Sequence, residues 1–165
     1  MNKKLLFLAL AIILLAGCSG RQKKEDEVSE GAQKVIEAMM TCPNTDLFNL
    51  DAVTVIGEGG VTTEEEKEKI KAANETLYRN WEEAVGEYFG YGYLESFINN
   101  GVAGQYLAEA EIENSTISVI QMSLDERKNG VEKITVTISV DGEEKQVKVT
   151  IKYDTEGLIK TVEVS

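Results

Sequence analysis

The sequence predicts an α+β fold, with about three N-terminal helices packed on one face of a C-terminal four-stranded antiparallel meander. The first observation is a change of period: apolar residues recur at helical spacing in the first part of the chain and at every second position over about the last fifty residues. The second is a pair of turn sequences, Asp141-Gly142 and residues 154–157, which separate alternating segments of strand length. Helices followed by a run of strands are typical of α+β domains.

The first predicted helix starts at Ser29, a good N-cap residue, and runs to about Thr41. Pro43 then prevents its continuation. One stripe of this helix is apolar and consists of Ala32, Val35, Ile36 and Met39. Beyond Pro43 we expect a turn and a short extended segment at residues 52–56.

The second predicted helix has the clearest start, because Thr63 followed by Glu66 fits a capping box. We expect this helix to end near Gly90. Its apolar face consists of Ile70, Ala73, Leu77, Trp81, Ala84, Val85 and Tyr88. A third helix is predicted over residues 93–108. Two glycines within it can break or kink it, namely Gly101 and Gly104.

The strands are predicted from strict alternation over residues 131–140, followed by the two-residue turn Asp141-Gly142 and a second strand over residues 143–153. A two-residue loop places Ile134 opposite Val149, so that the apolar faces of the two strands coincide. The opposite face is polar, with Thr135, Thr137, Gln146, Lys148, Thr150 and Lys152. We expect water or a partner on that face.

The two outer strands complete the predicted meander. A four-residue turn at residues 154–157 pairs Val149 with Val162, with Lys160 opposite Ile151 as the one exception to the apolar match. A strand at about residues 115–124 precedes a loop over residues 125–130. The alternation of this strand changes phase where Val119 meets Ile120, which predicts a β-bulge.

The N-terminal segment reads as a targeting signal. Lys3 and Lys4 precede an apolar run over residues 5–16, which is too short to span a hydrocarbon core of about 30 Å. The run ends in Leu15-Ala16-Gly17-Cys18, which resembles the lipobox of bacterial lipoproteins. The resemblance implies that Cys18 is acylated and becomes the first residue of the mature chain. One alternative is an ordinary signal peptide in which the cysteine occurs by chance. Another is an uncleaved apolar anchor that leaves Cys18 as a plain thiol.

We therefore predict a signal peptide (residues 1–17), a flexible tether (residues 18–28) and a single α+β domain (residues 29–165). The resemblance implies a diacylglyceryl group on Cys18, and two acyl chains hold a protein stably on a membrane. We therefore expect an outward-facing protein on the cell membrane, in a Gram-positive type of bacterium.

Composition excludes several classes of function. The chain after the signal carries 15 basic and 29 acidic side chains, a net charge of −14, which argues against binding nucleic acid. The sequence has no histidine, which removes the usual general base near neutral pH and the common zinc sites. Once Cys18 is acylated, Cys42 is the only free thiol, and we expect it to be buried. We predict no metal and no cofactor.

The order of elements resembles the nuclear transport factor 2-like and cystatin-like α+β folds. The resemblance is carried by the helical stripe from Ile70 to Tyr88 and by the meander from Ile117 to Val164. It implies a cone between helices and sheet, which either holds a ligand pocket or is filled by core side chains. The chain also resembles small lipoproteins of Gram-positive bacteria whose domains have no known function, and fold alone does not assign one.

Aromatic residues are the main candidates for a site, because eight of the eleven lie between residues 78 and 106. The candidates for a pocket lining or a core are Trp81, Tyr88, Phe97 and Tyr106. Their helical spacing favours a core. Tyr91 and Tyr93 flank Gly92 in the junction between two helices and are candidates for an exposed contact rim.

We therefore expect a membrane-anchored binding or interaction module. The alternative is a protein that binds a small apolar ligand in a cone-shaped pocket between helices and sheet. A histidine-free enzyme of the same fold is a third hypothesis, since carboxyl groups and tyrosines are available, but no spacing singles out a catalytic pair.

Overall fold

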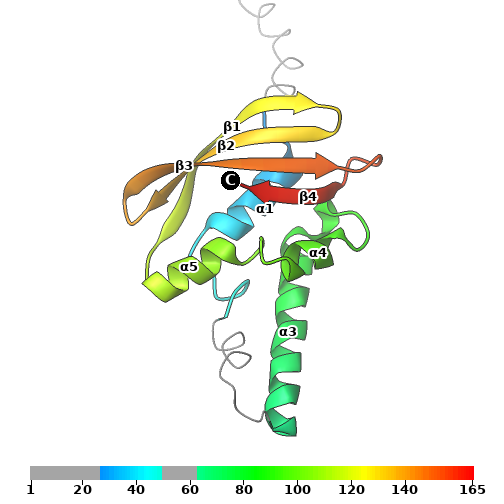
Figure 1. Ribbon diagram of the computed structural model, residues 1–165, viewed down its shortest axis with the longest axis vertical. Helices are drawn as coiled ribbons and strands as arrows, with labels where there is room; N and C mark the ends of the chain where they lie inside the picture. The colour runs from blue at the N-terminus through cyan, green and yellow to red at the C-terminus, as the bar shows by residue number, and fades with distance from the viewer. Residues whose placement is uncertain (1–26, 50–62) are drawn as a thin grey trace, which may run out of the picture.

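The computed structural model describes residues 27–49 and 63–165 (Figure 1). The predicted signal peptide, Cys18 and most of the predicted tether lie outside the described residues. So does the extended segment predicted at residues 52–56.

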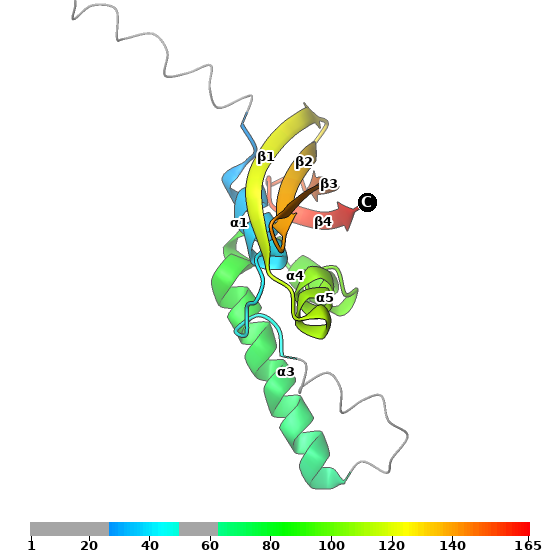
Figure 2. The ribbon, with the colours of Figure 1, turned by 90° about the vertical axis from the view of Figure 1, so that its left-hand side faces the viewer.

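The predicted α+β fold is confirmed. In the described residues, four α-helices and a 3-10 turn precede the strands: α1 (Glu30–Met40), α3 (Glu64–Val85), η1 (Gly86–Tyr88), α4 (Tyr93–Asn99) and α5 (Gln105–Glu113). The strands are β1 (Ile117–Lys128), β2 (Val131–Val140), β3 (Glu143–Tyr153) and β4 (Ile159–Val164). They form one antiparallel sheet in the order β1-β2-β3-β4 (Figures 1 and 2).

The helix starts follow the predicted capping chemistry. Ser29 caps α1, and its side chain accepts a hydrogen bond from the backbone N–H of Ala32. Thr63 and Glu66 form the reciprocal capping box at the start of α3. These contacts satisfy backbone N–H groups that have no partner inside the helix.

Two predicted helices end or divide earlier than expected. The helix predicted to reach Gly90 ends at Val85 and passes into the 3-10 turn η1. The single helix predicted over residues 93–108 is two helices, because Gly101 takes a left-handed φ of 80° and Gly104 becomes the N-cap of α5. The second helix also continues beyond the predicted end, to Glu113.

Much of α3 projects from the body of the protein (Figures 1 and 2). Among its 22 residues only Trp81 and Val85 are buried. The predicted apolar face is therefore only partly covered: Ala84 is exposed, while Ile70, Ala73 and Leu77 are half-buried. Residues 64–69 are all charged, so this end of the helix has no apolar side chain to bury.

The predicted register of the central hairpin is confirmed, with Ile134 opposite Val149 and Val136 opposite Val147. Asp141 and Gly142 form its turn with φ values of 51° and 91°. The predicted bulge in β1 is also present, between Val119 and Gln121.

Two predictions for the outer strands were wrong. The segment at residues 125–130 is not a loop, because β1 continues to Lys128 and turns tightly at Asn129-Gly130, with a second register shift between Leu124 and Glu126. Val149 pairs with Val164 and not with Val162, which instead faces Ile151. The turn is one residue longer than predicted, since Asp154 N–H donates to the Leu158 carbonyl, and the ladder shifts again near Tyr153.

The helices and one face of the sheet share one core. From the sheet it includes Ile134, Val136, Ile138, Val149, Ile151, Ile159 and Val162. From α1 it includes Ala32, Val35, Ile36, Met39 and Met40. Val28, assigned to the tether from sequence, also belongs to this core. The outer face of the sheet carries the predicted threonine and lysine side chains.

Candidate functional site

The membrane-anchor candidate, Cys18, lies outside the described residues, so its position relative to the domain is not given by the structure. Within the described parts of the chain, no helix combines the length and the apolar character that crossing a bilayer requires. The remaining predicted site residues all lie within the described part.

Trp81 and Phe97 are core residues. Trp81 is 1 % exposed, and its indole N–H donates to the Leu47 carbonyl at 3.0 Å. The rings of Trp81 and Phe97 meet edge to face, with centroids 5.6 Å apart and an interplanar angle of 85°. Phe89 packs against Phe97, with ring centroids 5.2 Å apart. Phe97 therefore contacts both of the other rings.

Tyr88 and Tyr106 lie at the margin of the same core and are half-buried. The Tyr88 ring lies against α1, where a Cβ placed on Gly31 would come within 3.0 Å of it. Burial raises the pKa of Tyr106 above its ordinary value, with a smaller contribution from the nearby Glu109 carboxylate. The structure thus brings Trp81 and Phe97 into direct ring contact and leaves the two tyrosines at the core margin.

Tyr91 and Tyr93 differ in environment. Tyr91 is fully exposed, at 104 % of its reference area, whereas Tyr93 is half-buried with Lys160 Nζ 5.8 Å from its ring centroid. Gly90 makes this turn possible, because a Cβ there would lie 2.7 Å from Asp154 Oδ2 and 3.0 Å from the Tyr93 ring. A fixed turn therefore presents Tyr91 to solvent.

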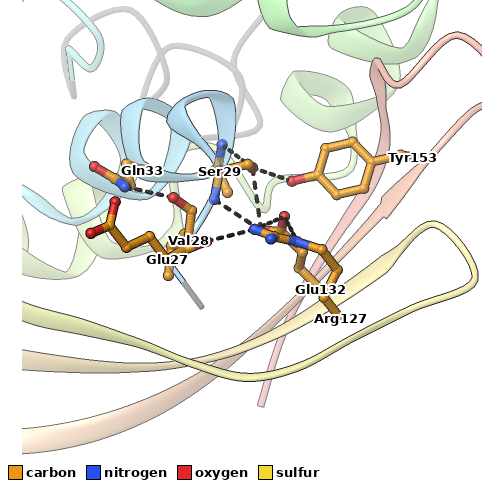
Figure 3. A network of polar contacts seen from close by, with 8 residues as sticks. Glu27, Val28, Ser29, Gln33, Arg127, Glu132 and Tyr153 are labelled. Atoms are coloured by element: carbon orange, nitrogen blue, oxygen red, sulfur yellow. Dashed lines mark hydrogen bonds and ion pairs between the residues drawn. The ribbon is translucent and has the colours of Figure 1, made fainter. Parts of the chain in front are cut away.

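A polar cluster that the sequence analysis missed lies where the chain enters the domain (Figure 3). We call it the junction cluster, and it consists of Glu27, Ser29, Arg127, Glu132 and Tyr153. Its centre is the Glu132 carboxylate, which is only 3 % exposed. Ser29 donates to Glu132 Oε2 from its backbone N–H at 3.3 Å and from its hydroxyl at 3.2 Å.

Arg127 completes the charge balance of the cluster. Its Nε and its terminal nitrogen each lie 2.9 Å from Glu132 Oε1, and the terminal nitrogen also donates to the Glu27 carbonyl at 2.6 Å. A buried carboxylate is tolerated only where charge and hydrogen bonds compensate for its lost hydration. Here both oxygens are engaged, so Glu132 joins the start of α1 to the end of the β1–β2 hairpin.

Tyr153 extends the cluster to β3. Its hydroxyl lies 2.6 Å from Ser29 Oγ. Either of these two hydroxyls can be the donor of this contact. Burial, opposed in part by the Ser29 hydrogen bond, raises the pKa of Tyr153 to about 12, so the phenol is protonated near neutral pH.

The junction cluster forms part of the wall of an open surface hollow of about 520 Å³, which Gln33 and Gly157 also line. The polar groups of the cluster bind one another, and Gln33 donates to the Val28 carbonyl at 2.7 Å. The arrangement is suited to fastening residues 27–29 to the sheet.

One sequence signal could have revealed the cluster. Glu132 occupies the same strand face as Ile134, Val136 and Ile138, and a charged residue at an inward position requires a partner. Arg127 lies directly opposite Glu132 across the tight turn at Asn129-Gly130, so this partner follows from spacing once the turn is recognised. Ser29 and Tyr153 come from other elements, and their place in the cluster could not be read from spacing.

The described residues offer little else for chemistry. They contain no group of three or more acidic or cysteine side chains placed to hold a metal ion. Cys42 is buried, and burial raises its thiol pKa to about 11, so it is protonated near neutral pH and unreactive.

Comparison with known proteins gave no assignment: no family model, no curated protein and no solved structure matches this chain.

Proposed function

We propose that the chain is an outward-facing lipoprotein, anchored to the cell membrane through acylated Cys18, whose domain serves as a binding or interaction module. The observation that carries the proposal is Leu15-Ala16-Gly17-Cys18 at the end of a twelve-residue apolar run that follows two lysines. Two acyl chains on Cys18 would hold the protein stably, because each buried methylene contributes about 0.8 kcal/mol.

The junction cluster supports a short connection between anchor and domain. Its first member is Glu27, so residues 18–26 would separate the acyl chains from the domain. Nine residues span at most about 30 Å when fully extended. The domain would therefore stay within a few nanometres of the membrane surface.

The placement of α3 supports an outward-directed surface. The described chain begins beside the sheet, where the Glu27 carbonyl accepts from Arg127, whereas α3 begins at the lower end of the molecule, away from the sheet (Figure 2). A chain held at its N-terminus would thus present the projecting half of α3 away from the attachment point.

The alternative function, capture of a small apolar ligand between helices and sheet, requires space beside Trp81. The full burial of Trp81, its bond to Leu47 and its contact with Phe97 favour a filled core over such a pocket. We therefore give preference to a function on the surface of the domain.

The test is to express the full chain and the variants Cys18→Ala and Cys42→Ala in a bacterium that processes lipoproteins. We expect the wild type and Cys42→Ala to sediment with membranes and to show an intact mass that corresponds to cleavage before Cys18 plus acyl chains. Cys18→Ala should lose both properties. A mature product that begins elsewhere, or carries no added hydrocarbon, would overturn the proposal.

A further inference from the structure

Among the described residues, the outer edge of β1 pairs with another segment only at its first residue, Ile117. Ile117 exchanges two backbone hydrogen bonds with Cys42, with N···O distances of 2.8 and 3.1 Å. From residue 118 to the end of β1, no other described segment forms a backbone ladder with this edge. Unpaired backbone groups on a strand edge are a template for another extended chain.

A hollow of about 400 Å³ follows this free edge. One of its walls is six consecutive residues of β1, from Val119 to Leu124, and Gln33 and Glu37 of α1 form the other wall. Glu27 and Val28 also line it. A groove between an edge strand and a helix is the geometry in which an extended peptide adds to a sheet.

The alternation of β1 identifies the peptide groups that face the groove. Ile117 bonds outward to Cys42, whereas the Thr116 carbonyl accepts from Asp141 N–H on the β2 side. The backbone N–H and C=O groups of Val119 therefore point outward. The extra residue at the bulge shifts the alternation, so the next residues whose backbone groups point outward are Met122 and Leu124.

The two bulges limit what can bind. They lie between Val119 and Gln121 and between Leu124 and Glu126, so only a short regular stretch separates them. A bulge bends and twists its strand, which disfavours a long continuous ladder with a second copy of β1. Two copies of this acidic chain would also repel each other, since the formal net charge is −12.

The chemistry of the groove indicates a basic occupant. Its charged lining residues are Glu27 and Glu37, and no lysine or arginine lines it. Lys34 Nζ lies 3.8 Å from Glu37 Oε2, but both side chains are more than half exposed, so this ion pair is weak. Ile120 is 52 % exposed at the bulge and offers an apolar contact.

We propose that the groove between β1 and α1 is a docking site for a short, extended, basic segment of a partner protein, which adds to the free edge of β1 near Met122. This inference rests on the proposed function as an interaction module and specifies its surface and the chemistry of its partner. Backbone bonds to β1 would supply affinity, and Glu27 and Glu37 would select lysine or arginine in the partner.

The experiment uses the full chain as isolated from expressing cells, in detergent micelles, and two fluorescent probes. One probe is a hexapeptide of three Lys-Val repeats, and the other is its Glu-Val counterpart. We expect the basic probe alone to bind, and to shift the backbone amide signals of residues 119–124 in a ¹⁵N-labelled sample. Binding of both probes alike, or shifts confined to other residues, would overturn the inference, as would no binding of the basic probe.

Two variants test the mode of docking. Met122→Pro removes an outward N–H without removing a β1–β2 bond, and should abolish binding. The double variant E27K/E37K should weaken the basic probe at least about tenfold, whereas E68K/E75K, with the same charge change on α3, should not. If Met122→Pro does not fold, the charge variants decide. Equal weakening by both double variants would show general electrostatic attraction and contradict a site at β1.

Failure of this inference is distinguishable from failure of the proposed function. Loss of membrane attachment in Cys18→Ala is measured without any peptide. A chain that is acylated and membrane-bound but ignores both probes would retain the anchor and exclude this groove. Self-association through β1, detected by sedimentation, would also overturn the inference.

Discussion

The Glu132 carboxylate accepts two hydrogen bonds from Ser29, which precedes it by 103 positions in the chain. Ser29 simultaneously caps α1, so one residue links the start of the first helix to the sheet. The junction cluster therefore attaches the N-terminal end of the domain to the sheet. Its contribution to the free energy of unfolding can be measured separately from that of the core.

Replacing Glu132 by alanine should lower the free energy of unfolding by about 2–4 kcal/mol, because Arg127 and Ser29 would lose a buried charged partner. Urea denaturation followed by circular dichroism measures the change. Glu126→Ala is the matched control, since it removes an exposed ion pair with Lys133 and should change stability much less. Equal effects of the two substitutions would contradict a special role for the buried pair.

The two helix N-caps provide a second comparison. Thr63→Ala removes a capping box at an exposed helix end and should destabilise the protein by about 1 kcal/mol or less. Ser29→Ala removes a cap together with its hydroxyl contacts to Glu132 and Tyr153, and should cost at least about 2 kcal/mol. Thermal unfolding of the two variants under identical conditions tests the order. A larger loss for Thr63→Ala would show that the junction cluster adds nothing to capping.

Tyr153 should make stability depend on alkaline pH. Its pKa is raised in the folded state from an ordinary value of 10.0 to about 12, so folding favours the protonated phenol. This contribution is fully present below pH 10 and is lost as the pH rises towards 12, because the unfolded chain releases the proton first.

The variant Tyr153→Phe isolates this effect from the other groups that titrate at alkaline pH. The difference in unfolding free energy between wild type and variant should become smaller as the pH rises from 10 towards 12. Urea titrations at neutral and alkaline pH measure it. A difference that stays constant, or widens, would contradict a raised pKa.

Substitutions of the aromatic candidates should change stability according to how far each ring is buried. Trp81→Ala should destabilise the protein by about 3–5 kcal/mol, because it empties a packed position and leaves the Leu47 carbonyl without its donor. Tyr91→Ala should change stability by no more than about 0.5 kcal/mol, because its ring is fully exposed. Chemical denaturation measures both. A neutral Trp81→Ala substitution would indicate that space already exists beside this ring.

Local sequence signals were sufficient for several parts of the fold. The Ser29 and Thr63 caps, the two-residue turn at Asp141 and the register of the hairpin that it closes are all confirmed. Each depends on residues close together in the chain, where capping geometry and turn length leave few alternatives.

The register of β4 was not determined by local sequence signals. The longer turn and the irregularity near Tyr153 together displace the pairing by two residues. A shift of two keeps every apolar side chain on the same face, so the hydrophobic pattern agrees equally well with both registers. Only the packed sheet distinguishes them.

The sequence alone determined the order of elements, the helix starts, the central hairpin and the buried face of the sheet, since these follow from local periodicity and turn chemistry. Tertiary structure decided that Trp81 and Phe97 contact each other and that Ser29 meets both Glu132 and Tyr153. It also decided that, among the described residues, the outer edge of β1 has no ladder partner beyond Ile117. These features join residues far apart in the chain, and their contacts are fixed by packing rather than by spacing.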